Sequence, residues 1–236
     1  MKINLKTTLC ALPLAMLSNL AVAGLSTTIT ATSDYTFNGV SQTQGDATIQ
    51  GSLDYADDAG WYVGTWGSGV DFGDDTSHEL DFYVGNTTDL SSAWSLDYGI
   101  AYYSYHGFTD ASSFNYPEVY SKFAYASSLG TTNINLWYSW DYAGKDVGHT
   151  IMMLSHTFDI ADNHSITLSG DVSNSFDADK HAWDELGLDS SYTHYYISYT
   201  TTQFDFDLTF TLEDTTIDGE HSDDRFVFAI SRTFDL

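Results

Sequence analysis

Histidine, serine and acidic side chains, the residue types that hydrolases combine, are plentiful in this chain of 236 residues. A nucleophile and its base must lie within hydrogen-bond reach. Ser155 and His156 are neighbours, but successive side chains of a strand point to opposite faces, so these two cannot pair directly. The sequence contains no Gly-x-Ser-x-Gly elbow, no His-x-x-x-His pair and no glycine-rich phosphate loop. We therefore expect no enzyme and assign no catalytic residue, and a hydrolytic site at His78, His106 and Asp110 is the alternative.

Acidic loops are the next candidates for chemistry, because carboxylate oxygens suit Ca²⁺ or Mg²⁺. Three predicted loops concentrate such residues, at 71–75, 177–179 and 218–224. None has the spacing of an EF-hand. We assign no metal ligand and no cofactor, and expect only a looser attraction of divalent cations that bridge these loops to lipopolysaccharide.

Carboxylates dominate the composition, with 33 Asp and Glu against 7 Lys and Arg. That balance excludes a nucleic-acid partner, since phosphate binding needs clustered cations. Many of the carboxylates alternate with apolar residues, so that they share one face of predicted strands. They are Asp34, Asp54, Asp71, Glu79, Asp81, Asp97, Asp141, Asp171, Asp205 and Asp207. An enclosed face of this kind would raise the local concentration of cations.

The elements that position these carboxylates are predicted to be strands, because a period of two recurs along most of the chain. Leu25, Thr27 and Ile29, for example, alternate with Ser26 and Thr28. About twelve strands are expected, starting near residues 25, 48, 61, 78, 94, 117, 132, 149, 164, 193, 204 and 225. Their connections alternate between short turns and long polar loops, notably 106–116, 174–192 and 214–224. This pattern predicts an all-β antiparallel transmembrane β-barrel.

The choice between a soluble and a membrane barrel depends on which face is outside. Large aromatic residues near predicted strand ends favour the membrane, as interfacial girdles. They are Tyr35, Phe37, Tyr55, Trp94, Tyr142, Phe158 and Phe234. The polar face then lines the lumen, with pore-lining residues Asp34, Asp54, Asp81, Asp97 and Asp141. A barrel of about twelve strands is narrower than the 16–18-stranded porins. The alternative is a closed lumen in which the carboxylates pair or share protons.

The first 23 residues are predicted to be a cleaved signal peptide. Lys2 and Lys6 precede an apolar stretch at 7–17, and Ala21-Val22-Ala23 is a small-x-small cleavage site. Residues 24–236 then form the barrel domain. Because the one cysteine, Cys10, lies in the leader, disulfides and thiol chemistry are excluded from the mature chain.

The segment Ser33–Gln42, with sequence SDYTFNGVSQ, resembles the opening motif of the TorF-type porins, also catalogued as the Gcw_chp family. Segments 49–55, 60–68 and 79–85 follow in the family's order and spacing. Asn38 is a departure, because the family usually has Arg at that place. The resemblance implies an outer-membrane β-barrel and names no substrate.

Together these patterns predict a channel in the Gram-negative outer membrane for passive diffusion of small cationic or neutral solutes. Its expected surroundings are outer-membrane lipids and lipopolysaccharide. Besides the hydrolase, the remaining alternative is a structural or adhesive barrel whose acidic loops bind a surface partner.

Overall fold

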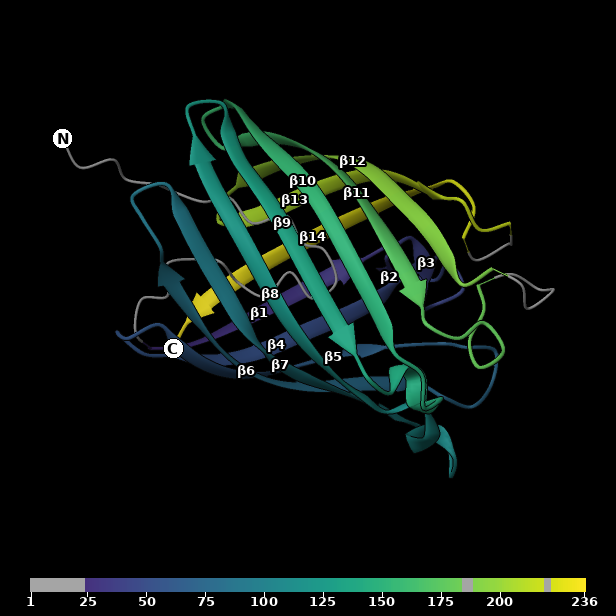
Figure 1. The fold of residues 1–236 in the computed structure, drawn as a ribbon. Helices are drawn as coiled ribbons and strands as arrows, with labels where there is room; N and C mark the ends of the chain where they lie inside the picture. Colours follow the sequence, from purple (N-terminus) through teal and green to yellow (C-terminus); the bar gives the residue numbers. More distant parts are fainter. Residues whose placement is uncertain (1–23, 184–188, 219–221) are drawn as a thin grey trace.

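Twelve antiparallel strands form a closed barrel in the computed structural model, which describes residues 24–183, 189–218 and 222–236 (Figure 1). The predicted signal peptide and residues 219–221 of the third acidic loop lie outside the described residues. The barrel strands are β1 (Gly24–Thr32), β4 (Thr48–Ala56), β5 (Trp61–Gly69), β6 (His78–Asp89), β7 (Trp94–His106), β8 (Tyr116–Ser127), β9 (Gly130–Ser139), β10 (His149–Ala161), β11 (His164–Ser175), β12 (Ser191–Gln203), β13 (Phe206–Thr215) and β14 (Arg225–Asp235). Within the described chain, no helix has the length and apolar character needed to cross a membrane.

The prediction of an all-β antiparallel barrel of about twelve strands is confirmed, and each predicted strand start lies within two residues of the observed one. Each strand pairs with its neighbours in the chain, and β1 closes the ring by pairing with both β4 and β14. Four short elements were not predicted. They are the paired strands β2 (Thr36–Phe37) and β3 (Val40–Ser41) and the 3₁₀ helices η1 (Ala111–Phe114) and η2 (Tyr142–Gly144).

The two ends of the barrel differ in the length of their connections. One, the short-turn end, also holds the start of β1 and the end of β14, and its turns fall at 57–60, 90–93, 128–129, 162–163 and 204–205. The other, the long-loop end, carries the connections at 33–47, 70–77, 107–115, 140–148, 176–190 and 216–224. The structure thus has the alternation of short and long connections that the sequence predicts.

The barrel has its apolar face outside. Phe82 and Ile100 are 52% and 41% exposed, whereas the alternating residues Asp81 and Asp97 are 0% and 3% exposed. Because side chains in a strand alternate between faces, the same period that exposes the apolar set encloses the carboxylates. This arrangement is the reverse of a soluble barrel and matches barrels that sit in lipid.

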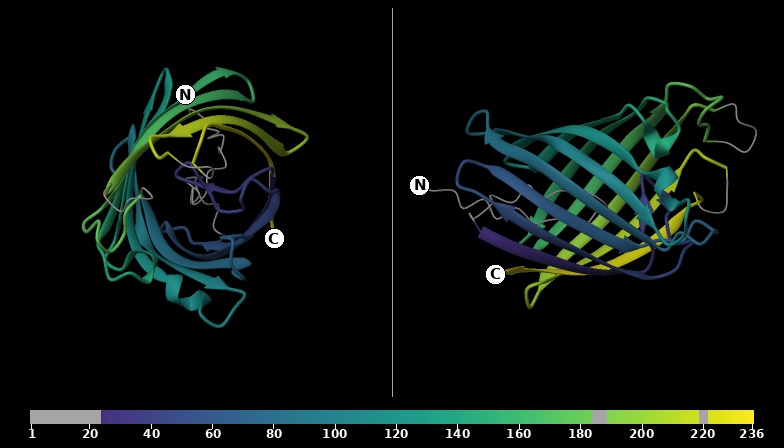
Figure 2. Two further views of the ribbon diagram at one scale, coloured as in Figure 1. Left: turned by 90° about the vertical axis from the view of Figure 1, so that its right-hand side faces the viewer. Right: turned by 90° about the horizontal axis from the view of Figure 1, so that it is seen from below.

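The expected aromatic girdle is present only in part. Tyr55, Trp94, Phe158 and Phe234 are exposed near strand ends, as predicted. Three girdle assignments are wrong, because Tyr35, Phe37 and Tyr142 do not lie on the outer face. Tyr35 and Tyr142 are buried, and Phe37 belongs to β2, a segment that lies inside the barrel (Figure 2, left).

Candidate functional site

A hairpin made of β2 and β3 folds into the barrel interior near the long-loop end (Figure 2, left). Its two-residue turn, Asn38-Gly39, has positive φ angles of 47° and 79°. Asn-Gly is the sequence that tolerates these angles best in a tight β-hairpin. β1 ends at Thr32, and its hydroxyl donates to the Asp34 carbonyl, 2.7 Å away. The chain therefore turns inward directly after β1.

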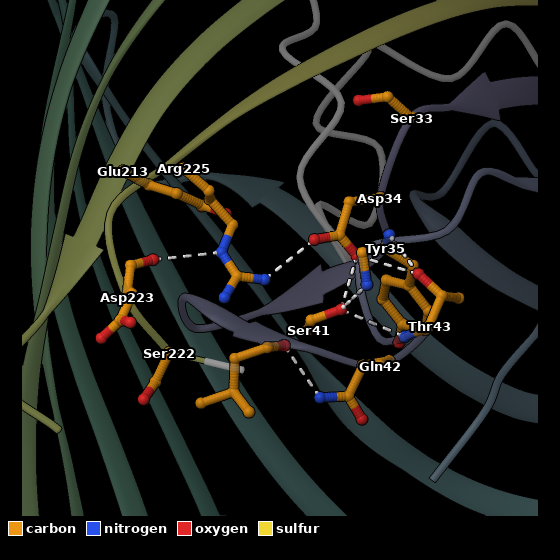
Figure 3. A network of polar contacts seen from close by, with 12 residues as sticks. Ser33, Asp34, Tyr35, Ser41, Gln42, Thr43, Glu213, Ser222, Asp223 and Arg225 are labelled. Atoms are coloured by element: carbon orange, nitrogen blue, oxygen red, sulfur yellow. Dashed lines mark hydrogen bonds and ion pairs between the residues drawn. The ribbon is translucent and has the colours of Figure 1, made fainter. Parts of the chain in front are cut away.

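The base of the hairpin is fixed by Asp34 (Figure 3). Its carboxylate accepts hydrogen bonds from Ser41 Oγ at 2.6 Å, Thr43 Oγ1 at 2.8 Å and Arg225 Nη1 at 2.8 Å. Arg225 lies at the start of β14, so this ion pair joins the hairpin to the wall. Hydrogen bonds between charged partners are about twice as strong as neutral ones. Asp34 thus holds the base of the hairpin to the barrel wall.

The segment reaches two opposite walls of the barrel. On one side, Tyr35 Oη donates to Glu79 Oε2 of β6 at 2.9 Å. On the other, Asn38 Nδ2 donates to Asp171 Oδ1 of β11 at 2.9 Å, and Tyr192 Oη of β12 donates to the Asn38 carbonyl at 3.0 Å. In the ring of twelve strands β6 and β12 are six places apart, which is diametrically opposite. The hairpin therefore crosses the lumen.

The tip of the hairpin lies tightly against the wall. A side chain at Gly39 would collide with Thr215 and with the ring of His194. His194 itself lies between two carboxylates, with Nδ1 2.7 Å from Asp171 Oδ2 and Nε2 3.3 Å from Glu213 Oε2. Only a doubly protonated ring can donate to both. The tip thus packs against a protonated histidine that lies between two carboxylates.

Tyrosines fill the interior on the β5–β8 side, where they donate to carboxylates. Tyr103 Oη donates to Glu118 Oε1 at 2.7 Å, and Tyr105 Oη to Glu79 Oε1 at 3.1 Å. These residues are buried, and the rings of Tyr103 and Tyr116 stack with centroids 4.5 Å apart. This half of the interior is a packed core of rings and carboxylates.

Asp54 and Asp97 have the same kind of partner nearer the short-turn end. Tyr83 donates to Asp54, and Tyr62 donates to Asp97. Lys122 Nζ lies 4.0 Å from Asp97 Oδ2. The charged interior therefore has few cations in the described chain. Its buried acids are Asp34, Asp54, Glu79, Asp81, Asp97, Glu118, Asp171 and Glu213, and its Lys and Arg are Lys122 and Arg225.

The five predicted pore-lining residues do not form one row. Asp54, Asp81 and Asp97 face the interior from β4, β6 and β7, and all three are buried. Asp34 also faces the interior, but from the hairpin and not from a strand of the barrel. Asp141 lies beyond the end of β9, where its Oδ1 accepts from the Asp146 backbone N–H at 2.7 Å. The placement of Asp141 on a lumenal strand is therefore wrong.

The alternative hydrolase is expected at the long-loop end, and two of its residues, His78 and His106, are neighbours there. His78 and His106 are cross-strand partners at the start of β6 and the end of β7, and both are exposed. They lie on the outward face, since they share the parity of Leu80 and Tyr102, which are exposed there. Asp110 makes no capping bond at η1. Within the described residues, no group of three or more His, Cys, Asp or Glu is arranged to hold a metal ion.

The hairpin is the feature that sequence reasoning missed, although the dipeptide Asn38-Gly39 carried a signal for it. Asn-Gly between apolar residues is a strong indication of a tight hairpin. The family motif Ser33–Gln42 includes this hairpin, so the motif encodes a structure in the lumen and not a barrel strand.

The fold is that of a twelve-stranded porin-type barrel. The porin NanC matches with a TM-score of 0.56 and 11% identity, over 90% of this chain and all of its own. The porin KdgM, solved in complex with disordered oligogalacturonate, matches with a TM-score of 0.58 and 7% identity, over 89% of this chain and 99% of its own. At these identities the likeness concerns the fold alone.

The chain belongs to the family described as "Bacterial protein of unknown function (Gcw_chp)", whose model matches residues 20–234. The resemblance noted at Ser33–Gln42 is thereby confirmed at the level of the family. No curated protein matches the chain.

Proposed function

We propose that the protein is an outer-membrane channel for passive diffusion of small solutes, with a preference for cations, and that the β2–β3 hairpin narrows its lumen. The observation that carries the proposal is the polarity of the barrel, which is apolar outside and acidic inside. An apolar outer face suits lipid, and the polar inner face suits an aqueous route. The porin fold of NanC and KdgM supports the same function.

The preference for cations follows from the charges that the barrel encloses. Eight acids are buried among the described interior residues, and the cations beside them are Lys122, Arg225 and the doubly protonated His194. Carboxylates near a narrow route attract cations and repel anions, because low-dielectric walls focus their field. Tyrosine hydroxyls donate to four of these acids, and a donated hydrogen bond favours the ionised form of a carboxylate.

The preference for small solutes follows from the hairpin. It spans the lumen between β6 and β12, so solutes have to pass beside it. A twelve-stranded barrel is narrow even without such an element.

The test is the planar-bilayer conductance of the refolded barrel under a salt gradient, which yields the reversal potential. Discrete current steps with a cation-selective reversal potential are expected. Asp54→Asn and Asp97→Asn should each move that potential towards zero, and Asp205→Asn, an exposed acid of a short turn, serves as the control. A folded barrel that never conducts would remove the proposal and favour the structural or adhesive alternative.

A further inference from the structure

An aromatic pocket of about 190 Å³ lies at the long-loop end, on the outer side of the hairpin. Phe37 and Val40 of the hairpin form one part of its lining. The rest comes from residues far apart in the sequence, including Tyr105 of β7, Tyr142 of η2 and Trp183 of the loop after β11. The long loops of the barrel therefore converge on this pocket.

The rings of the pocket form a continuous surface. Trp183 packs edge-on against Tyr192, with centroids 4.5 Å apart, and against His181 at 4.6 Å. The ring centroids of Tyr142 and Tyr116 are 5.0 Å apart. Contact between such aromatic faces and a flat apolar surface of a ligand is energetically favourable. Tyr142 and Trp183 lie at 52° to each other with ring centroids 6.0 Å apart, so together they form one angled aromatic wall.

The lining carries no Asp, Glu, Lys or Arg among the described residues, although the chain as a whole is strongly acidic. His181 is its one titratable imidazole. Burial, and then the nearby Lys145, lower the pKa of His181 to about 4, so that the ring is neutral at pH 7. A cation would lose its hydration here without gaining a counter-ion, and the nearest cation for an anion, Lys145, lies outside the lining and already donates to His181. An organic cation, which aromatic faces otherwise attract, would also meet Lys145, whose Nζ lies 3.0 Å from His181 Nδ1.

The pocket wall also contains hydrogen-bond donors without a partner in the described chain. Lys145 donates to His181 Nδ1, so the proton of the neutral imidazole is on Nε2, and this atom has no partner. The indole Nε1 of Trp183 is likewise buried and without a partner. Unpaired buried donors are costly, and a ligand that carries acceptors at its edge would satisfy them.

From these features we propose that the pocket binds one uncharged pyranose sugar, stacked on Trp183 with its edge towards Tyr142. A pyranose combines apolar C–H faces with hydroxyl groups at its edge, which matches rings and unpaired donors in one site. Its size also fits, because drug-sized ligands occupy about 300–1,000 Å³ and this pocket is smaller. The proposal deepens the channel function, since the sugar would be held immediately outside the hairpin.

The experiment measures binding of three sugars of one ring size and different charge to the refolded barrel in micelles. The probes are D-galactose, D-galacturonate and D-galactosamine, and the detergent has a head group that is not a sugar. Saturation-transfer NMR gives the affinity without any need for conduction. We expect saturable binding of galactose and weaker binding of both charged analogues.

Trp183→Ala should weaken galactose binding roughly tenfold, because it removes a stacking ring. Trp94→Ala, at the short-turn end, is the matched control and should leave the affinity unchanged. Since Trp183 lies in a loop, the barrel of the variant is expected to fold, and the mobility shift between unheated and heated samples on a gel checks this. Equal or tighter binding of a charged analogue, no saturable binding of galactose, or full affinity in Trp183→Ala would overturn the proposal. Binding without conduction would refute the channel alone, and conduction without binding would refute the pocket alone.

Discussion

The ion pair between Asp34 and Arg225 offers the sharpest test of the hairpin as the constriction. Both side chains are largely buried, with 9% and 13% exposure. Arg225→Met keeps the length of the side chain and removes its charge. A hydrogen bond to a charged group contributes about 1.5–3 kcal/mol, and breaking a buried pair costs about 3–5 kcal/mol. Asp34 keeps Ser41 and Thr43 as donors, so we expect a loss of about 2–3 kcal/mol.

This loss falls on the docked hairpin and not on the barrel, because Asp34 lies outside the barrel strands. Each 1.4 kcal/mol corresponds to a factor of ten. The population of the docked hairpin relative to the undocked one should therefore drop by about 30- to 140-fold. Single-channel recording of Arg225→Met should show more frequent and longer sojourns at a conductance above that of the wild type.

Arg232→Met is the matched control. Arg232 also lies on β14 and also pairs with an aspartate, Asp205, at 3.3 Å, but the pair is at the short-turn end and far more exposed. Exposed pairs contribute little. The control should keep the wild-type distribution of conductance. If Arg225→Met folds and also keeps that distribution, the hairpin does not limit the current and the reasoning is wrong.

Two further predictions concern a turn and a loop. Gly130, with a φ of 122°, leaves no room for a Cβ beside the Thr157 carbonyl, so Gly130→Ala should lower the free energy of unfolding in urea by about 2–4 kcal/mol. Gly45→Ala, at a φ of 83° in open space, should cost only about 1 kcal/mol. The pKa of His181 is lowered from 6.5 to about 4 in the folded protein, so on acidification the imidazole of the unfolded loop is protonated before that of the folded loop. The contribution of the neutral imidazole to the stability of the folded loop is therefore complete above pH 6.5 and is lost as the pH falls towards 4. Galactose affinity should fall over the same range, and His181→Gln should make it independent of pH; an unchanged profile in that variant would exclude His181 as the titrating group.

The barrel strands were predictable because one face of each strand is apolar and the other is polar. This difference produces a period of two that can be read directly from the residues of each strand. In β7, from Trp94 to His106, the alternation begins at the observed strand start, since Ser91 and Ser92 interrupt it in the preceding turn. The inward direction of Asp54, Asp81 and Asp97 follows from the same parity. The parity of a residue does not show how deeply its side chain is packed. The burial of these three carboxylates among tyrosine rings could therefore be seen only in the structure.

The strand ends were harder to predict, because polar side chains can form hydrogen bonds with backbone groups that would otherwise pair with the neighbouring strand. Tyr35 and Phe37 continue the parity of β1, yet the strand ends at Thr32, whose hydroxyl bonds the Asp34 carbonyl. Asp141 likewise continues the parity of β9, which ends at Ser139. Its carboxylate instead accepts from the Asp146 backbone N–H, a local turn that ends the ladder. Such bonds are short-range and leave the hydrophobic period unchanged.

Asp81 distinguishes an acidic, charged interior from one in which carboxylates share protons. It is 0% exposed, and both of its carboxylate oxygens are buried without a hydrogen-bond partner. Its charged neighbours are Glu79 and Glu118, which are of like sign. If Asp81 is ionised, Asp81→Asn relieves a buried, unpaired charge and should raise the free energy of unfolding by at least about 1 kcal/mol. It should also weaken the cation preference of the channel.

Asp34→Asn should have the opposite effect on stability, because the Asp34 carboxylate has three donors, one of which is the cation Arg225. The measurement is urea unfolding of both variants in the same micelles, with the reversal potential recorded on the same preparations. Stability that Asp81→Asn leaves unchanged, together with an unchanged reversal potential, would mean that Asp81 is already neutral. The carboxylates on the β5–β8 side would then share protons within a closed core, and a preference for cations would have to come from Asp171, Glu213 and the mouth of the barrel.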